Sequence, residues 1–95
     1  MIGYEDTLHK VSQDGLNLQY ASPALKNDYD VVMAAVRNNG RALEYASDAL
    51  RNDRVIVLAA VMKDSSALRF ASEALRNDPT LRTLQAAQDS DHFDF

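Results

Sequence analysis

The 95-residue chain contains no cysteine and no tryptophan, and it has only three glycines and two prolines. Without cysteine it can form no disulfide, thiol nucleophile or thiolate metal site, which fits a reducing compartment and leads us to expect a cytoplasmic protein. Few glycines are available for a phosphate-binding loop, and the motifs GxxxxGK[ST], GxGxxG, HExxH and GxSxG do not occur. We therefore expect no enzyme, no cofactor and no metal site.

Long apolar runs and an excess of basic residues are also missing. No apolar run approaches the roughly 20 residues of a membrane span, and the start MIGYEDTLHK lacks the basic region and apolar stretch of a secretory signal. Ten Lys and Arg against 14 Asp and Glu give a net charge of −4. Because duplex binding depends on clustered basic residues that neutralise phosphates, we expect neither duplex nucleic acid nor a membrane as a partner.

The chain does contain one motif three times, with a period of 25 residues: LQYASPALKND, LEYASDALRND and LRFASEALRND, beginning at Leu18, Leu43 and Leu68. A fixed period in this range is the signature of a repeat array. We predict an all-α fold, a short α-solenoid of about four helical-hairpin repeats, each with a long helix, a short helix and a Ser-capped turn. One domain covers residues 1–95, with units at about 1–15, 16–40, 41–65 and 66–95.

The two prolines indicate where helices begin, because Pro is favoured at the first helical position, directly after an Asp or Ser cap. Pro79 follows Asp78, and Pro23 follows Ser22. Gly15 and Gly40 lie where long helices end, a place that favours a residue tolerating positive φ. By the period, long helices are predicted at about 29–38, 54–63 and 79–88 after Asp28, Asp53 and Asp78, and short turns after Ser22, Ser47 and Ser72.

Packing between units is expected to depend on small and apolar side chains. The predicted helix over residues 55–62 is apolar on almost all sides, so we expect it to lie in the middle and to be covered on most sides. We also expect small side chains to let neighbouring units approach closely at two sets of positions beside the serines: Ala21, Ala46 and Ala71, and Ala24, Ala49 and Ala74.

The segment L-x-[YF]-A-S-x-x-L-[KR]-N-D, followed by VVMAAV and VIVLAAV, resembles a family of tandem repeats catalogued only as a domain of unknown function. The resemblance covers essentially the whole chain, although the last copy has RTLQAA in place of V-x-x-A-V, as an end cap does. It implies that such repeats occur in bacteria, protists and large viruses, including secreted effectors of intracellular bacteria that reach a host cytosol. It also implies no enzymatic activity of the repeat itself.

Residues with reactive side chains have simpler explanations. His9 and His92 lie at opposite ends of the array, so we expect both on the surface. The repeated Ser and Asp positions resemble nucleophiles and catalytic carboxylates, but capping is favoured for all of them. The tail DSDHFDF lacks the Gly and the terminal Glu of an EF-hand, so calcium binding is the weaker alternative to an acidic terminus in which Phe93 and Phe95 pack on the last unit.

One repeated surface feature is a candidate for partner binding. A basic residue followed by Asn recurs in every unit, and stacking would place these residues along one edge. We call this set the basic ladder: Lys26, Asn27, Arg51, Asn52, Arg76 and Asn77. We favour a structural role for it, and the alternative is a docking strip for an acidic partner, since Arg binds carboxylates through two parallel hydrogen bonds.

Repeat arrays act through the broad surfaces that stacking creates. We therefore expect a non-catalytic protein–protein interaction module. The first alternative is a small regulatory, inhibitory or effector-type protein that binds and modulates an enzyme, and the second is an accessory domain that positions a separate catalytic unit. A homo-oligomer formed through Phe93 and Phe95 is a further alternative.

Overall fold

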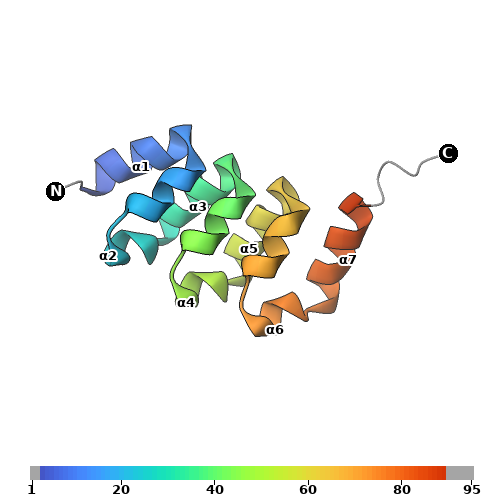
Figure 1. Ribbon diagram of the computed structural model, residues 1–95. Coiled ribbons are helices and arrows are strands. Elements are labelled where there is room, and N and C mark those ends of the chain that lie inside the picture. The colour runs from blue at the N-terminus through green and yellow to red at the C-terminus, as the bar shows by residue number, and fades with distance from the viewer. Residues whose placement is uncertain (1–2, 90–95) are drawn as a thin grey trace.

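The computed structural model describes residues 3–89, and over that range it consists of helices without any strand, which confirms the all-α class. Long α-helices lie side by side in a row, with 3-10 helices in front of them and short α-helices along one edge (Figure 1). The long helices are α1 (Tyr4–Gln13), α3 (Tyr29–Asn38), α5 (Arg54–Lys63) and α7 (Pro79–Asp89). The 3-10 helices are η1 (Gly15–Tyr20), η2 (Gly40–Tyr45) and η3 (Ser65–Phe70), and the short α-helices are α2 (Pro23–Lys26), α4 (Asp48–Arg51) and α6 (Glu73–Arg76).

The predicted caps fix the helix boundaries. Ser22 Oγ accepts a hydrogen bond from the backbone N–H of Leu25 at 3.3 Å, and Ser47 and Ser72 do the same for Leu50 and Leu75. The Oδ1 atoms of the aspartates accept from the N–H three residues later at 3.0–3.1 Å, which places the long helices where the sequence predicts them: Asp28 to Val31, Asp53 to Ile56 and Asp78 to Leu81.

A third set of caps begins the 3-10 helices. Asp14, Asn39 and Asp64 each accept, through Oδ1, a hydrogen bond from the N–H two residues later at 3.0–3.1 Å. The sequence analysis missed these caps, although the pairs Asp-Gly, Asn-Gly and Asp-Ser at the same position of each unit are the signal. The segments predicted as short helices are 3-10 helices, which is the usual form of brief helical connections.

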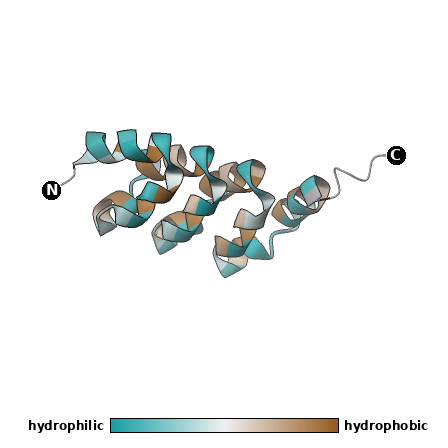
Figure 2. Ribbon diagram, turned by 45° about the horizontal axis from the view of Figure 1, so that its top comes forward, coloured by the Kyte–Doolittle hydropathy of each residue, from teal (hydrophilic) through white to brown (hydrophobic). Residues whose placement is uncertain are grey.

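The core lies between the row of long helices and the row of 3-10 helices. A valine is fully buried in each of α1, α3 and α5, and a leucine of each following 3-10 helix is fully or almost fully buried: Val11, Val36 and Val61, and Leu18, Leu43 and Leu68. Hydrophobic residues recur in each successive helix, whereas α1 is largely hydrophilic (Figure 2). Equivalent positions therefore form continuous buried columns along the row.

Gly15 and Gly40 have a packing role, and the prediction of positive φ is wrong, because no described glycine has it. A Cβ atom at Gly15 would lie 2.3 Å from the carbonyl oxygen of Ala35, and one at Gly40 would lie 2.3 Å from that of Ala60. Each glycine thus lets the start of a 3-10 helix touch the backbone of the next long helix. Ser65 takes this position in the third unit.

Two packing expectations need correction. Ala46 and Ala71 are buried, as expected, but Ala24, Ala49 and Ala74 are exposed and hold no units together. Helix α5 lies in the middle of the row, but its outward face is not covered: Val55 is 55% exposed and Met62 is 61% exposed. Neighbouring long helices cover only its flanks, because the units are stacked in one direction. No helix within residues 3–89 has the length and apolar character that crossing a bilayer requires.

Candidate functional site

The asparagines of the basic ladder join neighbouring units. Ser47 Oγ donates a hydrogen bond to Asn27 Oδ1 at 2.6 Å, and Ser72 Oγ donates to Asn52 Oδ1 at 2.6 Å. The backbone follows the same pattern: Ser47 N donates to Lys26 O at 2.9 Å, and Ser72 N donates to Arg51 O at 2.8 Å. Along this edge of the molecule, the same two hydrogen bonds therefore join one unit to the next, first at Ser47 and again at Ser72.

The basic side chains of the ladder have different surroundings. Arg51 is half-buried and forms an ion pair with Asp48 of the same short helix, while Arg76 is exposed. Beside the ladder, Arg54 forms an ion pair with Asp78 of the next unit, and its Nη2 lies 3.1 Å from Asp78 Oδ1. The hydrogen bonds from Arg54 and from the Leu81 N–H hold the pKa of Asp78 below its usual range. Arg51 and Arg54 are therefore already paired with carboxylates of the same chain.

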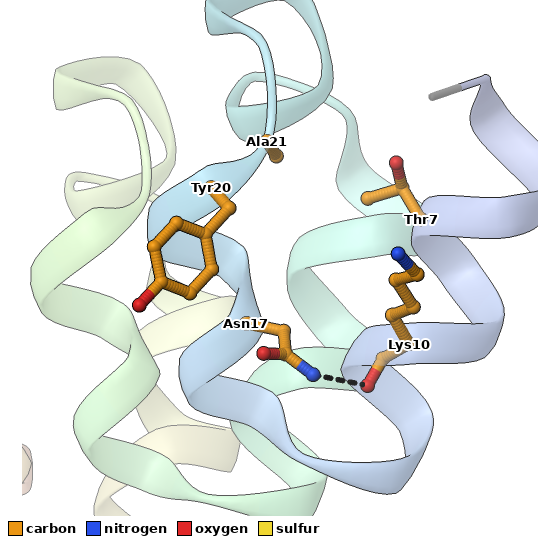
Figure 3. A pocket seen from close by; sticks show the side chains of 5 residues that line it. All are labelled: Thr7, Lys10, Asn17, Tyr20 and Ala21. Atoms are coloured by element: carbon orange, nitrogen blue, oxygen red, sulfur yellow. Dashed lines mark hydrogen bonds between the residues drawn. The ribbon is translucent and has the colours of Figure 1, made fainter. Parts of the chain in front are cut away.

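A hollow of about 250 Å³ lies at the N-terminal end of the row (Figure 3). Thr7 and Lys10 of α1 face Asn17, Tyr20 and Ala21, and Asn17 Nδ2 donates to Lys10 O at 3.2 Å. One period later, the equivalent positions are buried or half-buried against the first unit: Val32, Ala35, Ala42, Tyr45 and Ala46. The hollow is therefore the stacking face of a unit, made more polar by Thr, Lys and Asn, and Tyr20 beside it is 74% exposed.

The outward face of α5 carries an apolar stripe formed by Val55, Leu58 and Met62. Their spacing of three and four residues places them on one side of the helix. Val55 and Met62 are exposed, and Leu58 is half-buried. The equivalent positions of α3 are Asp30, Met33 and Arg37, of which the two charged residues are exposed. We call the set Val55, Leu58 and Met62 the α5 stripe. Sequence reasoning missed it, because the apolar pattern was assigned entirely to burial.

The residues with reactive side chains are scattered. His9 is exposed on α1, as expected, whereas His92, Phe93, Phe95 and most of the DSDHFDF segment lie outside the described residues. Within residues 3–89 no three His, Asp or Glu side chains come close enough together to hold a metal ion. The repeated Ser and Asp side chains are engaged as caps.

Comparison with known proteins gives one match. The family model described as Domain of unknown function (DUF4116) matches residues 8–51 and again residues 30–76, which together span more than half of the chain. The chain belongs to the DUF4116 family. No curated protein and no solved structure matches it. The two overlapping DUF4116 matches cover the three copies of the motif almost completely, and they leave α7 and the residues after it outside.

Proposed function

We propose that this DUF4116 chain is a non-catalytic protein-binding module, a short cytoplasmic solenoid of about four repeats that presents a stacked helical surface to a protein partner. The α5 stripe carries the proposal. Its apolar side chains remain exposed in the middle of the row, where the neighbouring unit has Asp30 and Arg37 at the same positions. Folding does not require apolar residues there, and exposed apolar clusters mark interaction sites.

The stripe suits an amphipathic partner segment that is acidic at the end that meets the C-termini of α3 and α5. Met62 is flexible and adapts to irregular surfaces, which is one reason why Met is enriched in interface cores. At the N-terminal end of the stripe, Asp30 is exposed and Arg54 is already paired with Asp78. At the other end, Arg37 and Lys63, near the C-termini of α3 and α5, are basic and exposed. A partner would bury the stripe at its centre and place acidic side chains against these residues at its rim.

The basic ladder is the weaker candidate surface. Asn27 and Asn52 already accept hydrogen bonds from the next unit, and Arg51 is paired with Asp48. A partner that used the Arg51 guanidinium would have to displace Asp48, which lowers the net gain. We therefore place the partner on the α5 stripe first and on the ladder second.

The test introduces into α5 two residues that the fold already accepts at the equivalent positions of α3. Val55→Asp together with Met62→Arg gives α5 the outward residues of α3, so the melting temperature should stay within about 2 °C of wild type. Arg51→Glu with Arg76→Glu is the matched ladder variant. A partner identified by quantitative capture is then titrated against all three purified proteins.

Loss of at least tenfold in affinity for the stripe variant, with the ladder variant close to wild type, supports the proposal. Loss in the ladder variant alone moves the site to the ladder. Equal affinity of all three proteins rules out both surfaces, and turnover of a substrate by the purified chain would contradict a non-catalytic role.

A further inference from the structure

A groove of about 300 Å³ lies toward the C-terminal end of the row, where η3, α6 and α7 meet (Figure 1). We call it the basic groove, and the described residues that line it are Leu68, Arg69, Arg76, Asn77, Arg82 and Gln85. We propose that the basic groove binds an acidic peptide segment of a partner protein, in which a serine or threonine lies among carboxylates. The proposal goes beyond the α5 stripe and does not depend on it.

The charges of the basic groove all have one sign. Its three arginines, Arg69, Arg76 and Arg82, are exposed, and none forms an ion pair with a described residue. No carboxylate is among the described residues that line the groove. A groove with charges of one sign concentrates ligands of the opposite charge. Because Arg binds carboxylates through two parallel hydrogen bonds, the groove suits a segment that contains Asp or Glu.

The arginines are departures from the repeated pattern. One period earlier, Glu44 stands in place of Arg69, and the fully buried Val57 stands in place of Arg82. An end unit needs a polar outer face, but charges of either sign serve that purpose. The chain has a net charge of −4, and yet both positions carry arginine. This choice favours recognition of an anionic partner over solubility alone.

The hydrogen-bond acceptors of the groove favour a peptide over an inorganic anion. One period earlier, a single serine of the next unit supplies both donors: Ser72 N donates to Arg51 O at 2.8 Å, and Ser72 Oγ donates to Asn52 Oδ1 at 2.6 Å. The equivalent acceptors here are Arg76 O and Asn77 Oδ1, and no donor to either is found among the described residues. A serine or threonine of a peptide brings an N–H and a hydroxyl, whereas a phosphate dianion offers only acceptors.

Two walls of the basic groove are held in place by neighbouring groups. The Arg69 guanidinium lies over the Phe70 ring, 4.8 Å from the ring centroid. Gln85 Nε2 donates a hydrogen bond to Ser65 O at 3.2 Å, which joins α7 to the start of η3. Side chains that are already held lose less conformational freedom when a ligand binds. The groove is therefore largely formed before its ligand arrives.

The first experiment titrates a synthetic peptide, acetyl-Asp-Asp-Ser-Asp-Asp-amide, into the 95-residue chain and follows the backbone amides by NMR. The amides of Arg69, Asn77 and Arg82 should show saturable shifts. A peptide with Ala in place of Ser should bind at least about threefold more weakly, and one with Asn in place of every Asp at least about tenfold more weakly. No saturable shifts, or equal affinity of the three peptides, would overturn the proposal.

Inorganic phosphate and a second copy of the chain are the competing occupants. Phosphate should bind at least about tenfold more weakly than the serine peptide, because it offers no donors to the two acceptors. Phosphate that binds as tightly as the peptide would make the groove a general anion site and overturn the proposal. Light scattering of the free chain should give a monomer. A dimer that Arg82→Glu dissociates would assign the groove to a second copy, which also overturns it.

The second experiment compares variants that are matched in charge. Arg82→Glu lies in the groove and Arg37→Glu outside it, and both side chains are exposed, so both variants should keep the melting temperature of wild type within about 2 °C. Arg82→Glu should weaken binding of the serine peptide at least about tenfold, and Arg37→Glu by less than about twofold. Equal losses in the two variants would show a general attraction of charges and overturn the proposal.

Asn77→Ala separates the hydroxyl contact from the charge contacts. This variant should weaken binding of the serine peptide at least about threefold and leave the affinity of the alanine peptide unchanged. Similar losses for both peptides would contradict the assigned acceptor. The stripe variant, Val55→Asp with Met62→Arg, should bind the serine peptide like wild type. Loss of peptide binding in the stripe variant would move the site to α5 and overturn the proposal, whereas failure of the groove variants leaves the α5 stripe untouched.

Discussion

At the residue scale, Ser47 and Ser72 each make two contacts with one hydroxyl group. The oxygen accepts from the N–H of its own short helix, and the proton goes to an asparagine of the preceding unit. Ser22 makes the first contact, and no hydrogen bond from its hydroxyl to another unit is found within the described residues. One side chain therefore fixes both the helix start and the distance between units.

Ser47→Ala should therefore cost more than Ser22→Ala. We expect a loss of about 1.5–2.5 kcal/mol in the free energy of unfolding for Ser47→Ala, because a cap and the donor for Asn27 are both removed. Ser22→Ala should cost only about 0.5–1 kcal/mol, the worth of an exposed cap. Urea unfolding measures both. Equal losses would mean that the bond between units contributes nothing.

Gly40→Ala tests the close approach between the backbone at Gly40 and the backbone of α5 at Ala60. The added Cβ would lie 2.3 Å from Ala60 O, so the backbone must move, and we expect a loss of about 2 kcal/mol or more. Gly3→Ala is the control, since nothing lies within 4 Å of the place that its added Cβ would take, and it should change stability by less than about 0.5 kcal/mol. A neutral Gly40→Ala would contradict the packing role assigned to this glycine.

Asp78 should make stability depend on acid pH. Its pKa in the folded chain is lowered, first by the hydrogen bond from Arg54 and then by that from the Leu81 N–H. The folded state therefore binds fewer protons than the unfolded state. The stabilisation is complete above the unfolded pKa of about 3.9 and is lost as pH falls through the lower folded pKa.

The urea midpoint of wild type should fall between about pH 5 and pH 2, and Asp78→Asn should flatten that dependence. Asn still caps a helix, so the variant should keep α7. Arg54→Gln should flatten the dependence by a smaller amount, because the backbone hydrogen bonds to Asp78 remain. Identical pH profiles for wild type and Asp78→Asn would refute this assignment.

At the element scale, the sequence predicts helix boundaries well, because they depend on local chemistry. Pro23 and Pro79 follow their caps directly, and the period transfers this register to the central units. The 3-10 form of η1 to η3 and the exposure of the α5 stripe depend on what packs against each element. Local patterns do not contain that information, so these features emerge only from the folded arrangement.

Alanine positions show the same limit, and they supply a matched pair of variants. Ala46 is 6% exposed, whereas Ala49, three residues later, is exposed. Ala46→Leu should overpack the contact between units and cost about 1–3 kcal/mol, and Ala49→Leu should change stability by less than about 0.5 kcal/mol. Calorimetry of the two proteins compares them directly. A tolerated Ala46→Leu would contradict the stacking register.

At the scale of the whole molecule, the units differ by position in the row. The first unit has a hollow at its outer face, the central helix α5 carries the apolar stripe, and the last unit ends in a basic groove. The candidate surfaces thus arise where a unit departs from the repeated pattern. Sequence reasoning found the basic ladder because it repeats, and it missed the stripe and the groove because each occurs in one unit only.

The central claim is that successive units are joined in register through their serines. Amide hydrogen exchange by NMR tests it most directly, because the N–H groups of Ser47 and Ser72 donate to Lys26 O and Arg51 O of the preceding unit. No backbone acceptor for the Ser22 N–H is found among the described residues, so Ser22 is the internal control. We predict that the Ser47 and Ser72 amides exchange at least about 100-fold more slowly than that of Ser22. Exchange of all three amides at similar rates would contradict the account.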